Sequence, residues 1–136
     1  MPDRPGGVGS RREARDRALS LLYEAETKDL DGQAVLAAQP VAVEGYARDL
    51  VEGVATHRST LDEVIATHAR GWTIERMPVL DVTLLRIAIY ELRHRPDVPS
   101  KVVLNEAIEL AKTYSTDDSP RFVNGVLAAV AAATDR

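Results

Sequence analysis

Arginines gather near the start of the chain. Arg11, Arg12 and Arg15 stand within five positions, Arg17 follows, and two interleaved acids leave a local charge of +2. On a helix of about 3.6 residues per turn, the first three lie within about 100° of one another. They can therefore face one stretch of phosphate backbone. A solvated helix start is the alternative, but arginines sit poorly against the positive end of a helix dipole, which favours a functional role.

Residue types that support catalysis or metal binding do not occur in suitable patterns. The chain has no cysteine, and its three histidines lack the spacing of paired metal ligands. Glu106 and Glu109 share one helical face, but no histidine follows either at the spacing that a di-metal carboxylate site needs. Glycine-rich phosphate loops and hydrolase motifs are also missing from the sequence. We therefore expect no enzyme, no metal and no cofactor.

Composition is typical of a soluble globular protein. The 136 residues are 45% hydrophobic and 28% charged, with a net charge of −4. This charge argues against non-specific coating of nucleic acid but allows a focused basic contact. One Trp, four Tyr and one Phe leave an aliphatic core that favours closely packed helices. Without a membrane-spanning segment or a secretory signal, we expect a cytoplasmic protein that does not bind membranes.

The chain reads as helices joined by short loops. Residues 1–9 carry two prolines and three glycines and are predicted to form a disordered arm. Ser10 is a plausible N-cap, with Glu13 completing a capping box, for a helix that runs to residue 27. A short helix at 33–38 ends before Pro40.

The remaining sequence continues the helical pattern. Further helices are predicted at 43–57, 59–69 (or one bent helix over both), 79–94, 100–114, and from Pro120 to about 133, with Ser119 as N-cap. Residues 79–94 are apolar nearly all round, which is typical of a buried central helix. The fold class is therefore an all-α compact bundle of six to seven helices, forming a single domain over 10–136.

Several ordered motifs then resemble the NusB family. They are LLRIAIYEL at 84–92, DVPSKVVLNEAIELAK at 97–112, FVNGVL at 122–127, LLYEAE at 21–26 and the arginine-rich start. The similarity runs from about residue 10 to residue 130. It implies a NusB-like RNA-binding domain that binds the boxA element of nascent transcripts with a small-subunit ribosomal protein called NusE. In that family the pair helps RNA polymerase to read through terminators, notably on ribosomal RNA operons, and other Nus factors take part.

The resemblance also implies an RNA-binding surface. The family's arginine-rich first helix falls on Arg11, Arg12 and Arg15, although Glu13 stands where relatives are often basic. The other positions implied to lie beside RNA are Lys101, Asp118, Phe122 and Asn124.

Each of these four residues also has a plain structural explanation. Phe122 could stack on an unpaired base or pack in the core. Asn124 could bind a base edge or be an ordinary surface residue. Asp118 would oppose phosphate and temper affinity, or it complements a helix N-terminus. Lys101 is a phosphate contact or a solvated lysine.

Two residues are implied to face the protein partner, Asp81 and Tyr23. Because ribosomal proteins are basic, an acidic contact at Asp81 makes electrostatic sense. Alternatively, Asp81 is a helix-start acid with Arg86 as its neighbour, and Tyr23 is a core tyrosine.

Two other functions stay open from the sequence. One is a helical interaction module whose main state is a homodimer, with RNA binding secondary. The other is part of an enzyme, since NusB-like domains also precede RNA methyltransferase domains. The chain contains no glycine-rich cofactor-binding segment, so we expect no catalysis.

Overall fold

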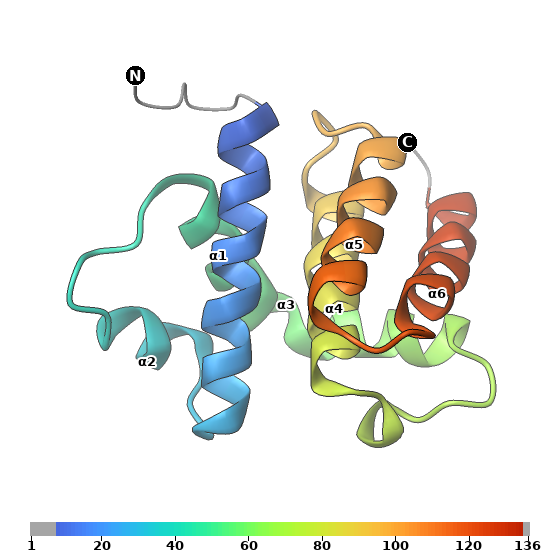
Figure 1. The fold of residues 1–136 in the computed structure, drawn as a ribbon, viewed down its shortest axis with the longest axis horizontal. Helices are drawn as coiled ribbons and strands as arrows, with labels where there is room; N and C mark the ends of the chain where they lie inside the picture. The colour runs from blue at the N-terminus through green and yellow to red at the C-terminus, as the bar shows by residue number, and fades with distance from the viewer. Residues whose placement is uncertain (1–7, 135–136) are drawn as a thin grey trace. The chain divides into compact units, whose positions relative to one another are not determined.

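The computed structural model describes residues 8–134, with side chains from Arg11 onward, and this part of the chain is helical without any strand (Figure 1). The elements are α1 (Val8–Thr27), α2 (Gly32–Ala37), α3 (Gly45–His68), the 3₁₀ turn η1 (Ile74–Arg76), α4 (Val79–His94), α5 (Ser100–Tyr114) and α6 (Ser119–Ala133). The all-α prediction of six to seven helices is confirmed. None of the described helices combines the length and the apolar character needed to cross a bilayer.

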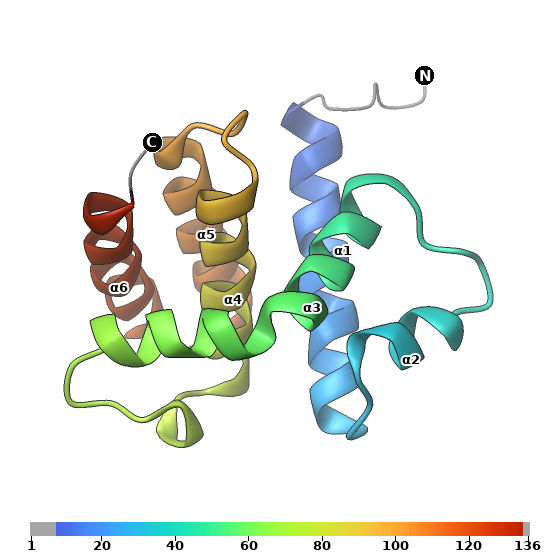
Figure 2. The same cartoon turned by 180° about the vertical axis from the view of Figure 1, so that it is seen from behind.

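Contacts divide the chain into two compact units, Met1–Thr56 and His57–Arg136, and α3 continues from one into the other (Figure 2). In the first unit, α1 packs against α2 over an aliphatic core. Asp31 caps α2 by accepting a hydrogen bond from the Ala34 N–H at 2.7 Å. A Cβ at Gly32 would lie 2.7 Å from the Cβ of Ala55, so the absence of a side chain lets α2 approach α3 closely.

The second unit is built around α4, which packs against both α5 and α6 (Figure 1). Twelve consecutive residues of this helix, 81–92, are buried. Side chains that are apolar nearly all round require contacts on every side, and the sequence prediction of a central buried helix at 79–94 is confirmed with these bounds.

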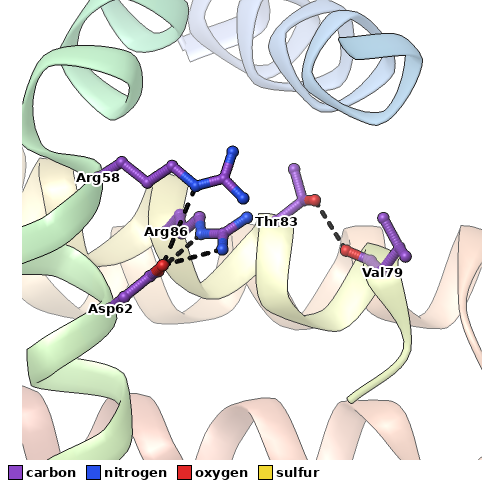
Figure 3. Close-up of polar contacts among 5 residues, drawn as sticks. All are labelled: Arg58, Asp62, Val79, Thr83 and Arg86. Carbon is purple, nitrogen blue, oxygen red and sulfur yellow. Dashed lines mark hydrogen bonds and ion pairs between the residues drawn. The ribbon is translucent and has the colours of Figure 1, made fainter. Parts of the chain in front are cut away.

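A partly buried ion pair joins α4 to the second half of α3 (Figure 3). The Arg86 guanidinium donates to both carboxylate oxygens of Asp62, at 2.8 and 3.1 Å. Arg58 approaches the same carboxylate more loosely, at 4.0 Å. Thr83, also buried, donates its hydroxyl proton to the Val79 carbonyl at 2.7 Å. The expectation that Arg86 neighbours Asp81 was wrong, because Arg86 turns towards α3.

Most helix boundaries outside α4 and α5 differ from the sequence prediction; α2, for example, spans Gly32–Ala37 instead of 33–38. Helix α1 already begins at Val8, so Ser10 lies inside the helix and residues 8–9 do not belong to an arm; residues 1–7 fall outside the described part. The two segments at 43–57 and 59–69 form one helix, because neither Pro nor Gly stands between them. At the start of α6 the N-cap position is Asp118, since the hydroxyl of Ser119 bonds to Ser115 and Thr116.

Candidate RNA and partner surfaces

The arginines of α1 differ in depth. Arg12 is exposed, Arg11 is partly buried, and Arg15 is only 3% exposed. The expectation that all three face one stretch of phosphate is therefore wrong for Arg15. Its position three and seven residues before the buried Ala18 and Leu22 places it on the core face of the helix. We call the pair Arg11 and Arg12 the α1 arginine surface.

An aromatic ring from α3 lies against these side chains. The guanidinium carbon of Arg11 is 4.6 Å from the ring centroid of Tyr46, and that of Arg15 is 5.8 Å away. Both distances fall within the roughly 6 Å over which an arginine is attracted to an aromatic face. Sequence reasoning did not find Tyr46 as a site residue. Its partners are far away along the chain, and helical spacing marks it only as part of an apolar face.

Tyr23 lies on α1, like the arginines, and is 42% exposed. The alternative of a core tyrosine is therefore wrong. An exposed tyrosine with an apolar body and a polar tip is suited to a protein interface. Contact with a partner stays a prediction for this residue.

In the second unit, an aromatic pair lies at the start of α6. The rings of Trp72 and Phe122 meet edge to face, with centroids 5.7 Å apart and planes at 62°. Trp72 is half exposed. A hollow of about 190 Å³ is lined by Trp72, Met77, Pro78, Asp81, Thr116, Asp118, Ser119 and Phe122. We call it the Trp72–Phe122 hollow. Its tryptophan was not among the predicted site residues.

A polar network forms one wall of the hollow. Asp81 is 2% exposed and accepts a hydrogen bond from the Ser115 hydroxyl at 2.5 Å. Ser119 donates to Ser115 at 3.0 Å and pairs with the Thr116 hydroxyl at 2.7 Å. These bonds tie the start of α4 to the α5–α6 connection. Burial leaves Asp81 no surface for a broad partner contact beyond its part in the hollow.

The other predicted RNA-binding residues lie either at α6, close to the hollow, or at the far end of α5. Asp118 is exposed at the mouth of the hollow and makes no side-chain cap bond, and Asn124 is exposed farther along α6. Lys101 is exposed in the first turn of α5, whereas the hollow lies beyond the last turn of that helix. At about 1.5 Å per residue, the length of α5 separates them by roughly 20 Å. The structure thus brings Asp118 and Phe122 together, but not Lys101.

Carboxylates and histidines do not gather into a metal site among the described residues. The chemistry available here is phosphate binding by arginine, ring stacking and hydrogen bonding at carboxylates. None of these requires a bound cofactor.

Comparison with known proteins gives a consistent result. Residues 12–132 match the sequence profile of the NusB family. A transcription antitermination protein NusB from Salinispora arenicola is 48% identical over 129 residues, covering 90% of this chain and 95% of the relative. One from Saccharopolyspora erythraea is 46% identical over 135 residues, covering 95% and 91%.

Solved structures share the fold. T. maritima NusB superposes with a TM-score of 0.80 at 33% identity, covering 90% of each chain. A chain from a crystal structure of the antitermination factors NusB and NusE in complex with dsRNA superposes with a TM-score of 0.78 at 26% identity. That match covers 93% of this chain and 99% of the other.

Proposed function

The chain belongs to the NusB family, and on that premise we propose that it is a non-enzymatic transcription antitermination factor. It binds boxA-type single-stranded RNA in nascent transcripts, those of ribosomal RNA operons among them, together with NusE. Its likeness, over 93% of its length, to a chain from a complex that contains NusB, NusE and RNA is the observation that carries this proposal. Other Nus factors and RNA polymerase are reached through this assembly, in the cytoplasm.

The α1 arginine surface supplies the main phosphate contact. Arg12 is exposed, and Arg11 is exposed in part, so both guanidinium groups can reach a strand. Arginine binds phosphate through paired N–H donors, and each contact releases condensed counterions, which makes affinity depend on salt. Lys101 adds a separate phosphate contact. Arg15 is buried beneath this surface, so it adds positive charge without touching the RNA.

The Trp72–Phe122 hollow receives an unpaired base. Aromatic side chains are the usual platforms for splayed bases in single-stranded RNA. The carboxylates that line the hollow disfavour phosphate, so an uncharged base is the part of the RNA that suits it. Asn124 offers an amide for a base edge, and Asp118 tempers affinity by opposing nearby phosphate.

NusE binds through the exposed ring of Tyr23, an anchor of the kind enriched in protein interfaces. Asp81 is buried, so its negative charge favours a basic partner through its electric field and not by direct contact.

Binding to boxA-like and scrambled single-stranded RNA, with and without NusE, tests the proposal. We expect tighter binding of boxA-like RNA and a further gain in affinity when NusE is present. Solution mass in the same samples reports whether the free protein is a homodimer. Equal affinity for both RNAs with NusE present would contradict the proposal and favour a helical interaction module.

A further inference from the structure

Two arginines of α1 share one ring of α3. Arg11 and Arg15 stand four residues apart, so they lie on the same side of α1. Both guanidinium groups are within attraction distance of the Tyr46 ring, at 4.6 and 5.8 Å. Like charges so close to one another repel, and the electron-rich face of the ring offsets part of that repulsion.

The two guanidinium groups differ in access to solvent. Arg15 is 3% exposed and is held inside the unit, whereas Arg11 keeps part of its surface open. An arginine side chain carries about 2 kcal/mol of rotamer entropy, which is lost when it grips a phosphate. An arginine whose guanidinium already lies on an aromatic ring loses less rotamer entropy when it binds a phosphate. The Nε of Arg11 is buried, so the terminal nitrogens of its guanidinium are the ones that can turn towards phosphate oxygens.

The backbone before Tyr46 fixes where the ring stands. Tyr46 is the second residue of α3, and Gly45 before it has φ +66°, a left-handed conformation that side chains rarely adopt. The chain therefore turns into α3 through a conformation that glycine permits, and the ring follows directly after the turn.

We infer that Tyr46 is a positioning residue for RNA recognition: its ring orders the guanidinium of Arg11 for a phosphate contact. This inference rests on the proposed RNA-binding function. It assigns to Tyr46 no contact with RNA of its own, and it assigns to Arg15 the role of a buried second cation on the same ring.

The experiment measures the affinity of the full chain for boxA-like single-stranded RNA over a salt series. Tyr46→Phe keeps the ring and should bind within about twofold of the wild type. Tyr46→Leu removes the ring and should weaken binding roughly three- to tenfold, the range expected for a lost cation–ring contact. Arg11→Lys keeps the charge but loses the planar group, and should weaken binding to a similar degree.

Two readouts separate positioning from a general loss of structure. The double variant Tyr46→Leu with Arg11→Ala should bind no more weakly than Arg11→Ala alone, because the ring acts through that arginine. Tyr46→Leu should also lower the salt slope by about one phosphate contact, as Arg11→Ala does. Tyr114→Leu and Arg70→Lys, exposed residues of the second unit, are the matched controls and should leave affinity unchanged.

Thermal unfolding of every variant identifies any that fails to fold, in which case Tyr46→Phe and Arg11→Lys decide. Additive losses in the double variant, an unchanged affinity in Tyr46→Leu, or full binding by Arg11→Lys would overturn the inference while RNA binding by the wild type stands. A wild-type chain that does not bind the RNA would overturn the proposed function, and the inference with it.

Discussion

The α1 arginine surface and the Trp72–Phe122 hollow combine the same ingredients with opposite charge. In the first unit, arginines lie on the ring of Tyr46. In the second unit, aspartates line a hollow walled by two aromatic rings. The first arrangement attracts phosphate and the second repels it. The difference teaches that charge decides what each region suits: the first fits the charged backbone of an RNA, and the second fits an uncharged base.

The two regions also share a pattern of depth. Each has a buried charge behind a more exposed one of the same sign: Arg15 behind Arg11, and Asp81 behind Asp118. Buried charges must be compensated, as Asp81 is by the Ser115 hydroxyl. In each region the outer residue is therefore the more accessible of the two.

The largest effect that we expect concerns the scaffold of the hollow. Asp62→Ala removes the carboxylate that receives two hydrogen bonds from Arg86, whose side chain is 5% exposed. Loss of a buried ion-pair partner costs about 2–4 kcal/mol here, somewhat below the fully buried case because Asp62 is 26% exposed. Urea unfolding followed by the fluorescence of Trp72, the only tryptophan, measures this change in the second unit.

Arg58→Ala is the matched control for this scaffold test. Arg58 contacts the same carboxylate at 4.0 Å, and its side chain is 50% exposed. Its removal should change the free energy of unfolding by less than about 0.5 kcal/mol. Equal destabilisation by Asp62→Ala and Arg58→Ala would show that the Arg86 pair does not stabilise the second unit.

A smaller effect tests whether the hollow reads bases. Phe122→Leu removes the aromatic face on which a base could stack. The affinity for boxA-like RNA should fall roughly tenfold, within the range for one stacked base. Affinity for scrambled RNA should fall less, and the salt slope should stay the same. Quenching of Trp72 fluorescence by RNA gives an independent signal. If Phe122→Leu lowered the affinity for both RNAs equally, and RNA did not quench Trp72 fluorescence, the prediction that a base binds in the hollow would be contradicted.

Tyr23→Ala sharpens the comparison for the protein partner. An exposed aromatic anchor at the edge of an interface contributes about 1 kcal/mol, so the affinity for NusE should fall roughly fivefold. RNA binding without NusE should not change. Titration of NusE by calorimetry, followed by RNA binding of the same sample, checks both statements. An unchanged affinity for NusE would show that NusE does not bind through Tyr23.

The smallest effect concerns the mouth of the hollow. Asp118→Asn removes a negative charge that opposes phosphate and should tighten RNA binding about two- to threefold at low salt, with the gain fading as salt rises. The residue makes no side-chain cap bond, so the helix loses only a dipole interaction. Unchanged or weaker RNA binding would remove Asp118 from the interface.

Helical periodicity was enough to place the strongly patterned elements. The bounds of α4 and α5 agree with the prediction, because their apolar faces are continuous and proline precedes α5. The predicted starts of α1 and α6 differ from the observed ones by only a few residues, because a serine or a capping pattern marks a helix end only approximately. The expectation of a single domain over 10–136 stays a prediction.

The candidate site was less accessible from the sequence. Residue type identified Arg11, Arg12 and Phe122, but the depth of Arg15 and Asp81 depends on which face each helix buries. Tyr46 and Trp72 acquire their roles from partners far away along the chain, Arg11 and Phe122 respectively. A single sequence carries no local signal for such pairs.

The most direct measurement compares salt slopes for boxA-like and scrambled RNA in the wild type and in the double variant Arg11→Ala with Arg12→Ala. If arginines bind phosphate and the hollow reads bases, the double variant should lose roughly 30-fold in affinity for both RNAs at low salt, since each charged contact contributes about 1 kcal/mol or more. Its salt slope should fall by about two phosphate contacts, while the preference for boxA-like RNA persists. An unchanged slope, or loss of the preference with the arginines, would contradict the division of roles between the two regions.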